Sequence, residues 1–127
     1  MDRSLKTLGG KILVGLIAIP LLIGGAKAMF DPTALVERIG VEPSGVVGLS
    51  TIRGALGGLL MGSGAMIIGG LVRKNTEWFL AVAALMAVAT LGRLVGLGLD
   101  GVDPAAVKAA VVEAVIVVVM VIAHKRL

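Results

Sequence analysis

The most constraining feature of this sequence is a set of four long apolar runs. They cover about residues 12–30, 46–72, 76–99 and 105–123. Each run is close to the ~20 residues that a helix needs to cross ~30 Å of hydrocarbon. Backbone groups in lipid must be satisfied within their own segment, which favours helices over open strands. We therefore predict an all-α integral membrane four-helix bundle with antiparallel neighbours, in which residues 1–127 form a single transmembrane domain.

Short polar segments separate the runs. The connections at 73–75 and 100–104 are tight, and Pro104 suits the first turn of the last helix because its missing N–H is not needed there. The connection at 31–45 is longer, and residues 32–39 are predicted to form a short interfacial helix.

The distribution of charge predicts the orientation in the membrane. Basic residues and the single histidine lie before the first run, between the second and third, and after the fourth: Arg3, Lys6, Lys11, Arg73, Lys74, His124, Lys125 and Arg126. The other two connections are mainly acidic, with Asp31, Glu37, Glu42, Asp100 and Asp103 against Arg38. The positive-inside rule then predicts that both termini are cytoplasmic.

A competing interpretation concerns the N-terminal segment. Residues 1–28 have a basic start, an apolar middle and Ala26-Lys27-Ala28 at the end, which is the pattern of a cleavable signal peptide. A lysine within the cleavage motif argues against cleavage, and we favour a retained first span.

Composition excludes several classes of function. The chain has no cysteine and one histidine, so disulfides, thiol catalysis, cysteine-bound metal and histidine-pair ligation of haem or zinc are excluded. With no tyrosine and only two phenylalanines and one tryptophan, it has few of the aromatic residues on which nucleic-acid bases stack. We expect no nucleic-acid partner, no metal and no cofactor, and we interpret the positive net charge as a signal of orientation.

Small residues are regularly spaced in the second and third runs. Gly54, Gly58 and Gly62 form one stripe at intervals of four, and Gly92 and Gly96 repeat the interval in the third run. Such stripes let membrane helices approach closely. Two interpretations stay open, namely packing within the bundle and an interface between copies of the chain.

Charged residues inside the apolar runs are the best indication of a site. Arg53, Arg93 and Glu113 lie within apolar runs, Lys27 is at a similar depth in the first run, and Asp100 shares a helical face with Arg93. Charge in a bilayer is costly and usually functional, and arginine cannot escape by deprotonation. We predict that these side chains converge, either as a structural salt-bridge network or as a cluster whose positive excess holds an anion. Sequence spacing reveals no nucleophile–base pair, metal-ligand set or phosphate loop.

The run of residues Arg53-Gly54, Arg73, Gly92-Arg93-Leu94, Asp100-Gly101 and Glu113 resembles a family of small bacterial four-helix membrane proteins. This family is of unknown function and loosely DoxX-like, and the resemblance covers most of residues 46–127. It implies a four-span bundle in a bacterial inner membrane and no established activity. DoxX-like proteins are associated with redox or quinol-linked membrane systems, but without cysteine or haem ligands we expect no redox role here.

Three classes of function follow. The first is a structural or accessory membrane protein that self-associates or joins a larger membrane complex. The second is binding or transport of an anionic or polar-headed ligand, such as a lipid, a quinone-like molecule or a small anion, in an outward-facing intramembrane pocket. The third, and the least supported, is an enzyme that uses Glu113 as an acid or base.

Overall fold

The computed structural model describes residues 3–127, with side chains from residue 7 onward. The side chains of Arg3 and Lys6, two of the orienting charges, lie outside this description. Over the described range the chain forms helices and connecting turns and contains no strand. Four helical stretches are long and apolar enough to cross a membrane: Thr7–Phe30, Gly45–Arg73, Glu77–Leu99 and Pro104–Arg126. The predictions of an all-helical chain and of four membrane-length helices are confirmed.

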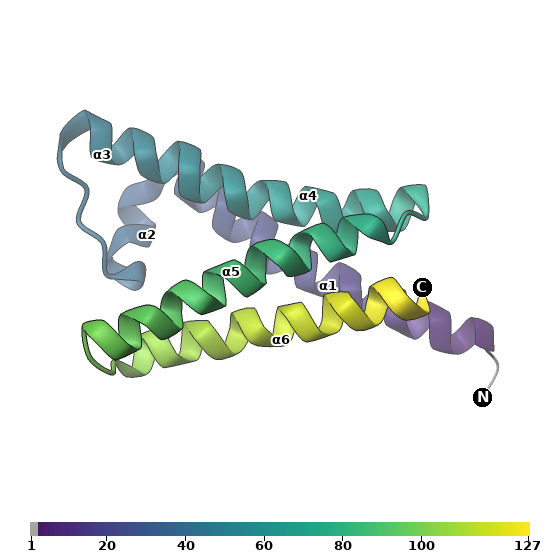
Figure 1. Cartoon of the computed structure of the whole chain (residues 1–127). Coiled ribbons are helices and arrows are strands. Elements are labelled where there is room, and N and C mark those ends of the chain that lie inside the picture. Colours follow the sequence, from purple (N-terminus) through teal and green to yellow (C-terminus); the bar gives the residue numbers. More distant parts are fainter. Residues whose placement is uncertain (1–2) are drawn as a thin grey trace. The chain divides into compact units, whose positions relative to one another are not determined.

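The helices follow the predicted runs closely (Figure 1). In chain order the elements are α1 (Arg3–Phe30), α2 (Pro32–Ile39), α3 (Gly45–Thr51), the π-helical segment η1 (Ile52–Leu56), α4 (Gly57–Arg73), α5 (Glu77–Leu99) and α6 (Pro104–Arg126). The short helix α2 has the predicted bounds. The second run is continuous but carries a stretch of π-helix, which the sequence pattern did not indicate.

The chain contains two compact units. Residues Met1–Val14 and Gly69–Leu127 form the first, called here the α5–α6 unit, and residues Gly15–Ile68 form the second, the α1–α4 unit. Both α1 and α4 pass from one unit into the other, so the membrane-length helices do not coincide with the units. The packing of all four helices into one bundle stays a prediction.

In the α1–α4 unit, glycine residues lie at the contact between α1 and α4. A Cβ atom placed on Gly25 would overlap the side chain of Met61 and lie 2.6 Å from its backbone nitrogen. A Cβ on Gly57 would lie 3.1 Å from the backbone nitrogen of Met29, and one on Gly64 would lie 2.7 Å from an α1 side chain. These glycines therefore allow backbone approach that a larger residue would prevent.

The predicted stripe of Gly54, Gly58 and Gly62 lies on another face of the same helix. A Cβ on any of the three would meet no atom of the α1–α4 unit within 4 Å. Neighbouring residues on a helix with 3.6 residues per turn point ~100° apart, so Gly57 can face α1 while Gly58 does not. Contact within this unit thus depends on Gly25, Gly57 and Gly64 rather than on the stripe.

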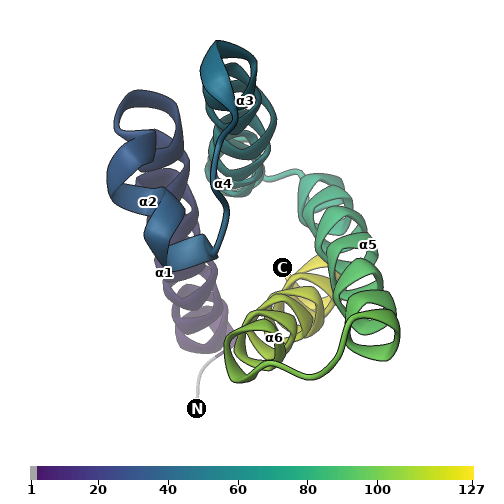
Figure 2. The ribbon, with the colours of Figure 1, turned by 90° about the vertical axis from the view of Figure 1, so that its left-hand side faces the viewer.

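In the α5–α6 unit, α5 and α6 form a helical hairpin and lie side by side in both views (Figure 1 and Figure 2). The buried α5 residues are Phe79, Val82, Ala83 and Met86, at the spacing of one helical face. The turn between the helices contains Gly101 with a φ of 109°, a conformation that favours glycine.

Helix α6 begins with the pattern expected of its sequence. The side chain of Asp103 accepts a hydrogen bond of 2.8 Å from the backbone nitrogen of Ala105, and Pro104 occupies the first turn. Asp103 therefore caps the helix and satisfies one of its free N–H groups. The predicted role of Pro104 is confirmed.

The turn between α4 and α5 is also tight. A Cβ on Gly69 would overlap the ring of Trp78, and one on Gly70 would lie 2.7 Å from the ring of Phe79. The guanidinium carbon of Arg73 lies 5.6 Å from the centre of the Trp78 ring, within the range of a cation–π interaction. This aromatic packing holds the end of α4 against the start of α5.

Replacing Gly25 by alanine should destabilise the protein, because the new methyl group would press on the backbone of Met61. Overpacking of this kind costs about 1–3 kcal/mol. The control is Gly24→Ala, one residue away, whose added Cβ would make an ordinary contact of 3.7 Å with Leu60. Unfolding of both variants in one detergent should show a lower midpoint for G25A only. Equal midpoints would contradict the close contact between α1 and α4.

Candidate functional site

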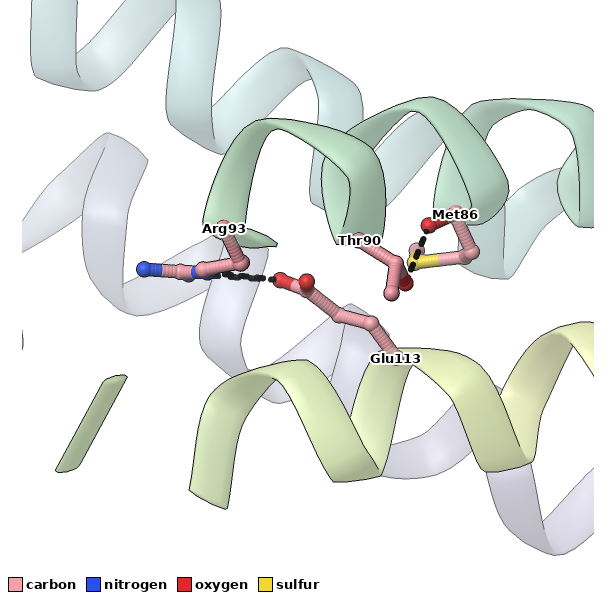
Figure 3. Close-up of polar contacts among 4 residues, drawn as sticks. All are labelled: Met86, Thr90, Arg93 and Glu113. Carbon is pink, nitrogen blue, oxygen red and sulfur yellow. Dashed lines mark hydrogen bonds and ion pairs between the residues drawn. The ribbon is translucent and has the colours of Figure 1, made fainter. Parts of the chain in front are cut away.

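Two charged side chains of the α5–α6 unit meet between α5 and α6. Arg93 on α5 forms an ion pair with Glu113 on α6, with 3.2 Å between Nη2 and Oε1 (Figure 3). The Nε group of Arg93 donates to the same oxygen at 3.4 Å. The Arg93 side chain is 47% exposed and that of Glu113 is 17% exposed. The arginine thus engages one carboxylate oxygen rather than both, unlike a two-oxygen fork.

The second carboxylate oxygen of Glu113 is left without a partner. Oε2 is buried and has no hydrogen bond to any residue that the structure describes. The hydroxyl of Thr90, which lies on the facing helix, donates instead to the backbone oxygen of Met86 at 2.8 Å (Figure 3). A buried acceptor without a donor costs free energy and calls for an explanation. Oε2 is therefore the atom of this ion pair whose hydrogen-bonding capacity is left unused.

An open pocket of about 570 Å³ lies beside this pair. Its lining residues are Ala89, Gly92, Arg93, Gly96, Leu97, Asp100, Gly101, Asp103, Ala106 and Glu113. A volume of this size falls in the range of ~300–1,000 Å³ that is typical of ligand pockets. Most of the uncharged residues are small, so space remains between the two helices at this level.

Gly92 and Gly96 line the pocket without making close contacts within their unit. A Cβ on Gly92 would meet no atom of its own unit within 4 Å, and one on Gly96 would approach only Asp100, at 3.8 Å. Sequence spacing predicts that both pack helices together, and packing against helices outside this unit stays a prediction. In the structure they leave the wall of the pocket free of side chains.

The charge of the pocket differs from the expected positive excess. One guanidinium, that of Arg93, faces the three carboxylates of Asp100, Asp103 and Glu113, which leaves a formal excess of two negative charges. One oxygen of Asp103 is occupied by the α6 cap at Ala105. The excess is acidic because the turn supplies two carboxylates. Such a pocket favours a cation or a hydrogen-bond donor and disfavours an anion.

Arg53 and Lys27 belong to the other unit. The Nη1 group of Arg53 donates a hydrogen bond of 2.6 Å to the backbone oxygen of Met29, in the last turn of α1. The last carbonyl groups of a helix lack partners within it, and a basic side chain can satisfy them. Lys27 is exposed on that same last turn. Convergence of either residue with Glu113 stays a prediction, and capping of α1 accounts for Arg53 within its own unit.

The π-helical segment that carries Arg53 was missed from the sequence. Within η1, the backbone of Ile52–Leu56 takes the wider turn of a π-helix. Such segments are rare and occur often at functional positions. The apolar run at 46–72 continues through this segment, so the run itself does not mark it.

The charged side chains that line the pocket are one guanidinium and three carboxylates. Among residues 7–127, no group of three or more histidine, aspartate or glutamate side chains could hold a metal ion. The lining contains no serine, threonine or histidine that could act as a nucleophile or its base. Its charged groups can accept and donate hydrogen bonds to one polar ligand.

Replacing Arg53 by glutamine should destabilise the end of α1, because the charged donor to Met29 is lost. A hydrogen bond from a charged group contributes about 1.5–3 kcal/mol when buried, and an exposed one less. We expect a loss of about 1 kcal/mol by the same reasoning. Arg38→Gln, an exposed arginine on α2 in the same unit, is the charge-matched control. Identical unfolding midpoints for R53Q and R38Q would show that Arg53 does not cap α1.

Comparison with known proteins gives one family. No curated protein and no solved structure matches the chain. The family described as a domain of unknown function (DUF4345) matches residues 10–124, which include every residue that lines the pocket between α5 and α6. The chain therefore belongs to the DUF4345 family.

Proposed function

We propose that this chain is an accessory membrane protein whose α5–α6 pocket holds the polar head of an amphiphilic ligand. The observation that carries the proposal is the buried Oε2 atom of Glu113, which has no partner among the described residues and lies on a carboxylate that lines the pocket. Arg93 engages the other oxygen and orients the carboxylate. A ligand that donates to Oε2 would remove the cost of the unpaired acceptor.

The proposed topology has four antiparallel spans with both termini in the cytoplasm. It is supported by the basic connection at Arg73-Lys74 and the basic end of α6, against the acidic turn at 100–103. The pocket then opens on the non-cytoplasmic side. Arg93 lies six residues from the end of α5, roughly 9 Å below that end at 1.5 Å per residue. The resemblance to bacterial four-span proteins suggests the cytoplasmic membrane of a bacterium.

The chemistry of the pocket narrows the class of ligand. Excess carboxylate disfavours a small anion, which was one of the expected ligands. A head that carries hydroxyl or ammonium donors fits better, since it can donate to Oε2 of Glu113 and to Asp100. The N–H groups of Arg93 that do not face Glu113 can bind an oxygen of the same head. A lipid head group and a quinol hydroxyl both satisfy this description.

A passive binding role fits the chain better than transport. Alternating access is usually built from paired repeats of spans, and four spans are few for it unless two copies assemble. An accessory protein that presents a bound amphiphile to a partner needs no such movement. The bilayer and other membrane subunits are the expected partners.

Glu113→Gln tests the proposal. Loss of the carboxylate should reduce the retained ligand at least tenfold, which corresponds to ~1.4 kcal/mol of binding free energy. Because Arg93 is about half exposed and lies roughly 9 Å below the end of α5, its long side chain can extend toward that end, and the unfolding midpoint should change little. Native mass spectrometry and solvent extraction of the purified protein measure the ligand, and thermal unfolding measures stability. Glu37→Gln, an exposed acid on α2, is the control.

The competing outcome is equally clear. If the ion pair only fixes the helices, wild-type protein carries no small molecule and E113Q unfolds several degrees earlier than E37Q. That combination would reject the ligand site and leave a structural pair.

A second candidate function is self-association through the stripe of Gly54, Gly58 and Gly62. Its support is that the α1–α4 unit leaves all three positions uncovered, and that Gly54 and Gly58 are exposed. Small residues at intervals of four allow two membrane helices to approach closely. A second copy of the chain, or a helix of another subunit, would then cover this face.

Replacing Gly58 by leucine should abolish this association, because the larger side chain would separate the two helices. Gly98→Leu is a matched control, since Gly98 also has open space around it but lies on α5, away from the stripe. Crosslinking in native membranes should show dimers for wild type and G98L, and monomers for G58L. If G58L crosslinks as wild type does, the stripe is not the interface.

A further inference from the structure

A second pocket lies at the opposite end of α6, in the same unit. It encloses about 490 Å³ between the start of α1 and the end of α6. Its walls include Leu13 and Val14 from α1 and Val119 and Ile122 from α6, and its rim includes Lys125 and Arg126. We propose that this pocket binds an anionic phospholipid, with the phosphate at the two basic residues and an acyl chain against the apolar walls.

The charge of this pocket supports an anionic occupant. Among the residues whose side chains the structure describes, Lys125 and Arg126 are the only ones lining this pocket that carry a charged side chain, and both are basic. Both basic side chains are exposed at the rim. The pocket between α5 and α6 has the opposite balance, with carboxylates in excess. Basic pockets between membrane helices on the cytoplasmic side are typical sites for anionic lipid head groups.

The apolar walls distinguish a lipid from a free anion. Val14 is buried, whereas Leu13 and Ile122 are 51% and 49% exposed, so apolar surface next to the basic rim stays uncovered. A free phosphate would use the two charges alone. A phospholipid would use both features, since its acyl chain can cover the walls while its phosphate stays at the rim.

The basic rim is attached to the rest of the unit by two contacts. The side chain of Leu127 lies against Gly10, where an added Cβ would be 3.3 Å from its Cδ2 atom. The Nδ1 atom of His124 lies 3.2 Å from the backbone oxygen of Thr76 at the start of α5. These contacts on either side of Lys125 and Arg126 position the two cations beside the walls.

The experiment compares lipid binding to the full-length protein in neutral detergent. Phosphatidylglycerol and phosphatidylcholine are titrated separately, and bound lipid is measured by native mass spectrometry. The variant is K125Q/R126Q, and the control is R38Q/K108Q, which removes two exposed cations outside the pocket. Inorganic phosphate and glycerol 3-phosphate are added as competitors that carry the anion without acyl chains.

The wild-type protein and R38Q/K108Q should prefer phosphatidylglycerol, and K125Q/R126Q should bind it roughly tenfold more weakly, as expected for two basic contacts. Neither small competitor should displace the lipid at equal concentration. Equal binding of the two lipids, or an equal loss in R38Q/K108Q, would overturn the proposal. Displacement by inorganic phosphate or glycerol 3-phosphate would assign the site to a free anion and would likewise overturn it. None of these outcomes depends on the pocket at Glu113.

Discussion

The requirement that polar groups inside hydrocarbon find partners governs this structure. Arg93 lies within a helix of membrane length, and its partner is one oxygen of Glu113. The partner of Arg53 is the backbone oxygen of Met29. The two arginines look alike in the sequence, yet one forms an ion pair and the other caps a helix. Only Oε2 of Glu113 remains unpaired among the buried side-chain nitrogen and oxygen atoms that the structure describes, and the proposed ligand site depends on it.

Glycine has three different roles in the same chain. Gly25 and Gly57 bring α1 and α4 into contact, where a methyl group would press on backbone atoms. Gly92 and Gly96 clear the wall of a pocket. Gly58 and its stripe face away from the contacts of their unit. Small residues permit close approach but do not determine what approaches, so the surrounding helices decide which role each glycine takes.

In the α5–α6 unit, the two ends of α6 carry opposite charge. Carboxylates surround the pocket near Glu113, and two cations rim the pocket near Lys125. A helix with this distribution has an electrostatic reason to hold one orientation in a bilayer. The same distribution gives the two pockets different preferences, for hydrogen-bond donors at one end and for phosphate at the other.

The helices and their breaks could be predicted from the sequence, because they depend on local properties. These properties are the length of each apolar run, the breaks after Phe30 and Leu99, and the preference of Pro104 for the first turn of a helix. The pairing of Arg93 with Glu113 was among the predicted contacts, since both are expected in the outer half of neighbouring spans. Tertiary structure decided the rest: which glycine face meets a helix, that Arg53 reaches Met29, and that the turn makes the pocket acidic. The physical reason is that the sequence pattern of a helix predicts the depth of a residue in the membrane, and the side of the helix on which it lies, to within about one helical turn. Contacts depend on which helices pack together and at what rotation, and these are properties of the folded chain.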